Sequence, residues 1–529
     1  MSSRVILKDA NVYRSSISMA TKECIVVNDG YIEAIIPEGD SSLIEYSGSE
    51  LSLDGLTILP GLYDSHIHIL QYSQSIDYVD CDTPSLNECL GRVRDKTKTT
   101  ETGSWIIGHG WDQNRWARLG TRDDLDNVSE HHPIFLTSRS LHSAWVNSKA
   151  LSLARIDQST PDPEGGIILR TNSNLPTGIL LEKAVDIVSN IIPAPSTEDA
   201  AELIKIGQQR LWQFGLVGVH NYDRKLSFQA LQLLHRRGEL GLRILQSLPL
   251  DSLPSALSIG LQQGIGDEWL KIGSVKLFMD GALGPHTAAM QSPYENEPEN
   301  SGVLLINKDE LISILRTADA ANLPLSIHAI GDLANRVVLD AIEQYYDTSD
   351  SPQPKGSMHR IEHAQLLRPE DISRFSTLNV AASMQPLHAT SDMAMAEENW
   401  GTRCKYAYAW KSLLQADAVL LFGSDAPVES PNPFLGIHAA VTRRRIDGSP
   451  DENGWIPAQK LSLSDALHAY TQAPSEFYVS RKLKGILEPT LPADLIVLKE
   501  DPFKVQPHEL KDISPSGTMV GGKWRYRTF

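Results

Sequence analysis

A regular alternation of apolar strands and helical segments through the middle of the chain is the feature that most constrains its fold. Stretches with helical periodicity, at 309–321, 335–346 and 463–471, separate the strands. The apolar, β-branched runs lie at residues 215–219, 243–248, 273–278, 325–330, 358–363, 380–384 and 419–423. Repeated strand–helix units form a parallel sheet with right-handed crossovers. With residues 57–59 as the first strand there are eight, which predicts an α/β fold with a TIM-like (β/α)8 barrel.

The two ends of the chain show a different pattern of short strands and tight turns. An Asn28-Asp29-Gly30 turn lies near the start, and a Gly521-Gly522 turn separates two short strands near the end, as in β-hairpins. We therefore predict a small β-sandwich domain formed by both termini, residues 1–59 with 478–529, and a barrel at 60–477. The alternation is interrupted at about 70–197, which predicts an insertion after the first strand.

Composition excludes several classes of partner. The 529 residues include 48 Lys and Arg against 66 Asp and Glu, a formal net charge of −18. A chain this acidic binds nucleic acid and anionic membranes poorly. Its four cysteines form no CxxC pair, and the N-terminus lacks the apolar core of a signal peptide. No apolar run approaches the ~18 residues that span a bilayer. We expect a cytoplasmic protein with a small-molecule substrate, no nucleic-acid or membrane partner, and either a monomeric or a homo-oligomeric state.

A His-x-His pair, His66 and His68, follows the Leu59-Pro60-Gly61 segment. Residues i and i+2 of an extended chain point to the same side, and at the carboxyl end of a barrel strand that side is the active-site mouth. Neutral imidazoles are ligands for zinc, manganese, iron or nickel. Taken alone, such a pair is as well explained by hydrogen-bonded structural histidines.

Three further polar residues end apolar runs in the same way. His328 and His363 close two of the predicted strands, and Asp425 follows a third. Polar residues at the carboxyl ends of barrel strands indicate catalysis. Together with the His-x-His pair, they form a set with the identity and number of ligands that a divalent metal needs, which favours a metal site over chance.

Lys276 lies inside an apolar strand, where an ammonium is costly unless it is neutralised or paired. Burial lowers the pKa of a lysine, and the neutral amine can react. Added carbon dioxide would give a carbamate, an anion with two oxygens that can bridge two cations. The alternative is a buried ammonium paired with Asp280 or Asp425.

These residues and their surroundings resemble the amidohydrolase superfamily of metal-dependent hydrolases, and within it the YtcJ-like amidohydrolase 3 family. The motifs span nearly the whole chain and lie at 59–68, 110–112, 275–284, 327–332, 360–365, 385–386, 423–428 and 493–497. The sequence departs from the family at His286, where an arginine is common, and at 490–492.

The resemblance implies that His66 and His68 bind one metal, that His328 and His363 bind a second, and that a carbamylated Lys276 bridges them. Asp425 would bind the first metal and serve as the catalytic acid and base. The cofactor would be a divalent metal, zinc by expectation, as one or two ions. The reaction would be hydrolysis of an amide, cyclic amide, ester or lactone by a metal-activated hydroxide. Among these, carbon–nitrogen bonds other than peptide bonds are the expected target.

Substrate-binding candidates are Trp111, Asp112, Arg115, His142 and His286. Packing also explains Trp111, and a surface ion pair explains Asp112 and Arg115. A structural hydrogen bond explains His142 as well as a substrate contact does. Glu362 alternates with His363, so we expect it to face away from the mouth in a structural role.

Three other interpretations stay open. A mononuclear enzyme would use His66, His68, His328 and Asp425 and leave Lys276 unmodified. A barrel of this family could instead catalyse a lyase, decarboxylase or cyclase reaction at the same metals. A catalytically inactive scaffold could keep the fold, although the intact ligand set argues against it.

Overall fold

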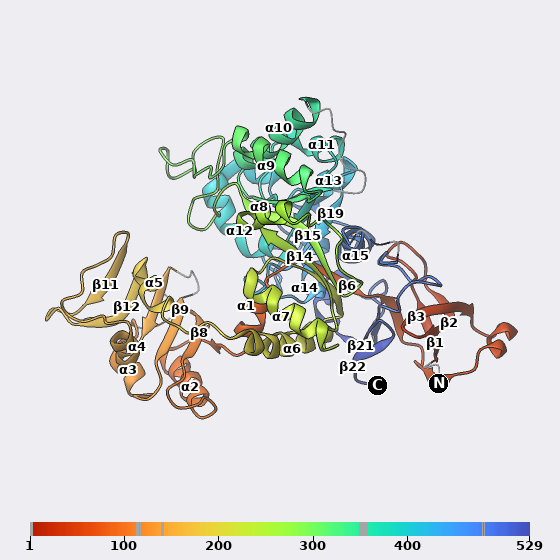
Figure 1. The fold of residues 1–529 in the computed structure, drawn as a ribbon, viewed down its shortest axis with the longest axis horizontal. Coiled ribbons are helices and arrows are strands. Elements are labelled where there is room, and N and C mark those ends of the chain that lie inside the picture. The colour runs from red at the N-terminus through yellow and green to blue at the C-terminus, as the bar shows by residue number, and fades with distance from the viewer. Residues whose placement is uncertain are drawn as a thin grey trace. The chain divides into compact units, whose positions relative to one another are not determined.

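The computed structural model describes residues 4–112, 116, 118–138, 142–348, 358–478, 480 and 482–529. The chain divides into two compact units, Met1–Ser73 with Thr197–Phe529 and Gln74–Ser196 (Figure 1). Among the described residues, none of the helices combines the length and the apolar character that crossing a bilayer requires.

Eight parallel strands form a barrel sheet in the larger unit, in the order β19-β18-β17-β16-β15-β14-β13-β6. Their bounds are β6 (Leu62–Ile67), β13 (Leu216–Asn221), β14 (Arg243–Pro249), β15 (Leu270–Phe278), β16 (Leu325–Ala329), β17 (His359–His363), β18 (Val380–Met384) and β19 (Leu420–Phe422). Most of these strands are buried along their whole length, which explains why they are continuous apolar runs rather than alternating ones. The prediction of an α/β fold with a barrel-like parallel sheet is confirmed.

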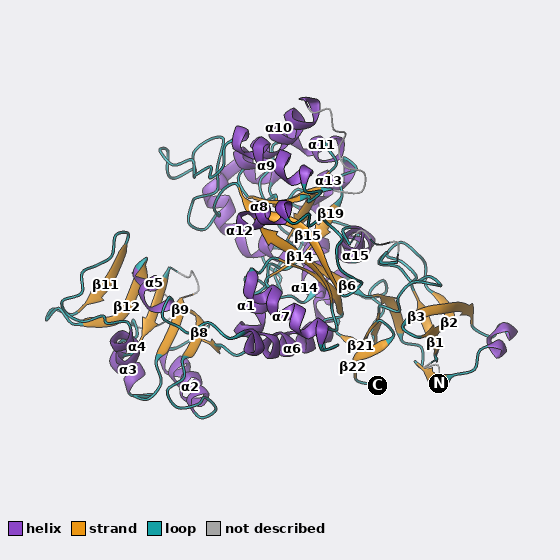
Figure 2. Cartoon of the chain, in the orientation of Figure 1, coloured by secondary structure: helices purple, strands orange, loops and turns teal. Residues whose placement is uncertain are grey.

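Helices surround the barrel strands (Figure 2). They are α1 (Ile69–Ser75), α6 (Thr197–Gln213), α7 (Lys225–Arg236), α8 (Leu253–Ser258), α9 (Lys308–Ala320), α10 (Asp332–Thr348), α11 (Pro369–Thr377), α12 (Pro386–Trp400), α13 (Trp410–Gln415), α14 (Pro433–Thr442), α15 (Leu463–Tyr470) and α16 (Gln472–Glu476). Local sequence signals explain helix α9. A capping box of Asn307 and Glu310 marks its start, and Leu311, Leu315 and Ala318 form its buried face.

The strands of both chain ends form one eight-stranded sheet, in the order β22-β21-β20-β5-β1-β2-β3, with β4 paired to β1. Their bounds are β1 (Val5–Val12), β2 (Thr21–Asn28), β3 (Tyr31–Pro37), β4 (Ser49–Ser52), β5 (Thr57–Pro60), β20 (Leu495–Leu498), β21 (Pro515–Val520) and β22 (Lys523–Arg527). Leu7, Ile25, Ile58 and Val497 pack together in the core of this sheet.

The unit Gln74–Ser196 has its own six-stranded sheet, in the order β11-β12-β10-β9-β8-β7. Its elements are β7 (Val79–Asp80), α2 (Leu86–Thr97), β8 (Ile106–Trp111), α3 (Arg122–Asp126), β9 (Ile134–Ser138), β10 (Ser143–Val146), α4 (Ser148–Leu153), β11 (Gly166–Arg170), β12 (Pro176–Glu182) and α5 (Ala184–Ser189).

The prediction that residues 57–59 form the first barrel strand is wrong. They belong to β5, which pairs with β1 and β20 in the terminal sheet. The first barrel strand is β6, which begins just after Gly61. Every residue from 57 to 67 is buried, so the degree of burial does not change where the chain leaves one sheet for the other.

The barrel closes where the chain after β19 meets β6. The backbone N–H of Asp425 donates to the carbonyl of His66 at 2.7 Å, and the N–H of His68 donates to the carbonyl of Ala426 at 2.9 Å. Gly423 permits this approach, because a Cβ atom there would lie 2.4 Å from the backbone nitrogen of His66.

We therefore expect Gly423→Ala to lower the free energy of unfolding by about 1–3 kcal/mol, as overpacking of a tight core does. Gly91→Ala is the matched control: the added Cβ would meet nothing within 4 Å, and alanine favours the interior of α2. Thermal unfolding followed by circular dichroism measures both. An unchanged midpoint for Gly423→Ala would contradict the close contact between β6 and β19.

Candidate metal centre

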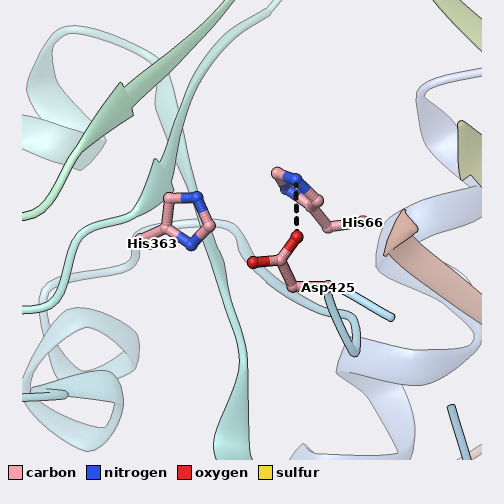
Figure 3. Close-up of side chains that lie close together, drawn as sticks. All are labelled: His66, His363 and Asp425. Carbon is pink, nitrogen blue, oxygen red and sulfur yellow. Dashed lines mark ion pairs between the residues drawn. The ribbon is translucent and has the colours of Figure 1, made fainter. Parts of the chain in front are cut away.

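The six residues predicted as metal ligands all lie at the carboxyl ends of barrel strands. His66 and His68 lie at the end of β6, Lys276 on β15, His328 on β16, His363 on β17 and Asp425 after β19. The structure brings one ligand atom each of His66, His363 and Asp425 within 4.8 Å of one another, and Figure 3 shows these side chains gathered around one point.

The spacing around Asp425 fits a bound cation. Its Oδ1 lies 3.4 Å from Nε2 of His66 and 3.5 Å from Nε2 of His68, and its Oδ2 lies 3.4 Å from Nε2 of His388. Two ligands on ~2.1 Å bonds to a tetrahedral zinc ion lie about 3.4 Å apart. The chemistry and the separations of these imidazole and carboxylate donors therefore fit a divalent metal ion.

Each of three imidazoles has one ring nitrogen held by the protein. Nδ1 of His66 lies 2.6 Å from Oε2 of Glu362, and Nδ1 of His363 lies 2.9 Å from Oε1 of Gln385. His328 instead uses Nε2, which lies 2.9 Å from the carbonyl of Gly281. The other nitrogen of each ring is left for a ligand, the arrangement found around metal-binding histidines.

Burial sets the charge of these groups. It lowers the pKa of His66 to about 4 and the pKa of His328 to about 3, so both rings are neutral at neutral pH, as ligation requires. Burial disfavours the charged form of Asp425, yet the imidazoles of His66 and His388 hold the pKa of this carboxyl well below its usual range. The site thus offers neutral imidazoles at His66 and His328 and an ionised carboxylate at Asp425.

His68 differs from His66 and His328. Burial opposes its protonation, but hydrogen bonds to Asp223 and Asp425 raise its pKa to about 9. Nδ1 of His68 lies 3.5 Å from Oδ1 of Asp223. A proton and a metal cation would therefore compete for this ring.

Lys276 is buried, and its Nζ has no hydrogen-bond partner among the described residues. The nitrogen lies 5.1 Å from the ring centre of Tyr222 and 4.9 Å from that of Phe278. Burial lowers the pKa of Lys276 to about 8. The carboxylate of Asp280 accepts instead from the backbone N–H groups of Ala289, Ile330 and Gly331.

The expectation that Glu362 faces away from the site is wrong. Its carboxylate contacts His66 inside the barrel. The alternation rule assumes an extended backbone, but His363 has a φ of 73°. The left-handed residue at the end of β17 lets neighbouring side chains reach the same site. Asp425, with a φ of 59°, is in the same region, and such conformations concentrate at functional sites.

Sequence reasoning gave no role to several polar residues that touch the predicted ligands, although Gln385 lies within one of the family motifs. His388 contacts Asp425, Asp223 contacts His68, and Gln385 contacts His363. Gln385 follows the apolar run of β18 and Asp223 follows β13 closely, so the strand-end rule applied to those two strands would have found both.

Three of the predicted substrate contacts, Trp111, Asp112 and His142, belong to the Gln74–Ser196 unit. In the Gln74–Ser196 unit, Trp111 is buried and its Nε1 donates to the carbonyl of Leu136 at 2.8 Å, while Asp112 follows at the end of β8. In the same unit, Nδ1 of His142 lies 2.9 Å from Glu182. Arg115 lies outside the described residues.

His286 lies in the loop after β15 of the barrel unit. Its Nδ1 is 2.7 Å from Oε1 of Glu297, and its ring stacks on Tyr294 with centroids 5.0 Å apart.

A family profile described as the amidohydrolase family matches residues 50–526. The chain belongs to the amidohydrolase family. It is 30% identical to YtcJ of Bacillus subtilis (strain 168), an amidohydrolase by name, over 95% of this chain and 96% of the relative. The N-substituted formamide deformylase of Arthrobacter pascens is 26% identical, covering 99% of this chain and 98% of that protein.

The structural comparison agrees with the family. The crystal structure of a metal-dependent hydrolase from Pyrococcus horikoshii OT3 superimposes with a TM-score of 0.80 at 30% identity, covering 96% of this chain and 99% of that one. Membership of the amidohydrolase family and this neighbour support a hydrolase, and the cluster of His66, His363 and Asp425 supports a divalent metal.

We expect zinc to stabilise this amidohydrolase after removal of metal by a chelator. A ligand at 100 times its Kd that binds only the folded state adds about 2.7 kcal/mol to the free energy of unfolding. His363→Gln should lose most of this gain, whereas His286→Gln, which removes an imidazole that contacts Glu297, should keep it. Thermal unfolding with and without zinc measures the effect, and an equal gain in all three proteins would exclude His363 from the metal centre.

Proposed function

We propose that this protein is a metal-dependent hydrolase that cleaves a carbon–nitrogen bond of a small amide or cyclic amide, with esters and lactones as related substrates. The observation that carries the proposal is the placement of Asp425, whose carboxylate lies 3.4–3.5 Å from the imidazoles of His66, His68 and His388. An ionised carboxylate in a buried ring of imidazoles suits both cation binding and proton transfer.

In this proposal His66, His68 and Asp425 would hold one cation, with zinc the best fit to the donor set. His328 and His363 would hold a second, and a carbamylated Lys276 would supply oxygen ligands to both. The amine of Lys276 is buried and has no hydrogen-bond partner in the part of the chain that the structure describes, which supports the carbamate. The neutral amine adds to carbon dioxide, forms a C–N bond and releases one proton.

A divalent cation, when bound, lowers the pKa of water and polarises a carbonyl oxygen. The chain's own contribution to the reaction is proton transfer at Asp425. Its carboxylate accepts the proton of the attacking water and then delivers it to the leaving nitrogen. His388, at the second oxygen of Asp425, keeps that carboxylate oriented between the two tasks.

The choice of first substrates follows from a relative. The Arthrobacter protein named N-substituted formamide deformylase matches nearly the whole chain, so N-substituted formamides and other N-acyl amines are the first class to test. Cyclic amides and lactones complete the screen, which uses full-length protein loaded with zinc.

We expect Asp425→Asn to abolish turnover while the metal content stays above half of that of the wild type. Asparagine keeps the shape of the side chain and one oxygen ligand but cannot accept the proton. Steady-state kinetics and elemental analysis measure the two quantities. Asp451→Asn, a surface change of the same kind, serves as the control. Turnover of Asp425→Asn within tenfold of the wild type would refute the acid–base role.

We expect Lys276→Ala to lose at least one metal ion and most activity, because two cations close together repel strongly even at an effective dielectric constant of ~20. Acetate or propionate should restore part of both by placing an oxygen anion in the vacated space. Elemental analysis and kinetics across a carboxylate titration test this. Loss of stability without rescue would support an unmodified structural lysine.

A further inference from the structure

We infer that Glu362 is a positioning residue that fixes the proton of His66 on Nδ1, so that Nε2 is free to bind the cation. This inference rests on the proposed metal-dependent function. Oε2 of Glu362 lies 2.6 Å from Nδ1 of His66, and both side chains are fully buried. An ionised carboxylate only accepts hydrogen bonds, so Nδ1 of His66 must be the donor.

The ring of His66 is held in orientation as well as in protonation. Tyr222 stacks on it with ring centroids 4.0 Å apart and an interplanar angle of 22°. With Nδ1 tied to Glu362, the opposite nitrogen faces the carboxylate of Asp425, 3.4 Å away. The position of one proton therefore decides whether His66 presents a lone pair or an N–H to the cation.

The contacts of the second oxygen of Glu362 fix which side of its carboxyl group faces Arg360 and which side faces His66. Oε1 accepts a hydrogen bond from the hydroxyl of Tyr222 at 2.8 Å and another from Nε of Arg360. Arg360 has donors only, so the atom facing it must be an acceptor. Its guanidinium cannot turn away, because it also donates to the carbonyl of Ser65 and to Nδ1 of His220.

This geometry makes Glu362→Gln a test with a defined outcome. The amide oxygen must face Arg360, so the amide NH2 must face Nδ1 of His66. A donor at that position turns Nδ1 into the acceptor and moves the proton of the neutral ring to Nε2. The variant keeps size and shape but presents the wrong nitrogen to the cation.

We expect Glu362→Gln to raise the Kd for zinc by 10- to 100-fold, the range seen when partners of metal-binding histidines are removed. Competition with a chromophoric chelator measures the Kd on the full-length chain. Asp371→Asn is the matched control, since this buried carboxylate of α11 also pairs with arginines, Arg336 and Arg374, but lies outside the ligand set. Its zinc Kd should stay within about twofold of the wild type.

A second readout is independent of zinc and of turnover. Solid-state 15N spectra of histidine-labelled, metal-stripped protein report which nitrogen of His66 carries the proton, with the resonance assigned by its loss in His66→Gln. The wild type should show the proton on Nδ1, and Glu362→Gln should show it on Nε2.

A proton on Nε2 in the wild type would overturn the inference, even where Glu362→Gln fails to fold. An unchanged zinc Kd in a folded Glu362→Gln protein would also overturn it. Correct protonation and zinc binding without hydrolysis of any tested amide would refute the proposed reaction and leave the role of Glu362 standing.

Discussion

The carboxylate of Asp64 joins the first strand of the barrel to the last, and the metal centre depends on that junction. Oδ1 accepts from the backbone N–H groups of His66 and Ser424, both at 3.0 Å, and Oδ2 accepts from the Ser424 hydroxyl. Burial raises the pKa of Asp64 to about 7, against the pull of these donors. Together with the backbone hydrogen bond from Asp425 to the carbonyl of His66, this junction brings together two residues that lie 359 positions apart in the sequence.

A layer of buried charge lies in the barrel next to the metal ligands. Arg360 and Glu362 are both buried and form an ion pair. The attraction within a buried ion pair rarely exceeds the free-energy cost of removing both charges from water, so such pairs add little to stability. Here the pair has a different use, since Arg360 orients the carboxylate that holds His66. The barrel interior therefore combines an apolar strand framework with a small polar layer that serves the site.

Strand-end residues were the part of the site that the sequence could predict. His328, His363 and Asp425 each close an apolar run, and the rule that barrel strands end at the active site needs no coordinates. Glu362 was misjudged, because the positive φ of His363 breaks the alternation on which the prediction relied. His388 lies in the first turn of α12 rather than at a strand end, so no strand pattern marks it.

The sequence by itself determined the α/β class, the alternation that makes eight parallel strands and the residue types able to bind a metal, because periodicity and ligand chemistry are local properties. Only the tertiary structure decided which buried segment forms the first strand of the barrel, since residues 57–67 are all buried but belong to two different sheets. It also decided which nitrogen of His66 is held and which is free. That choice depends on Glu362 and Arg360, which are separated from His66 by about three hundred residues of chain and meet it only because the barrel closes.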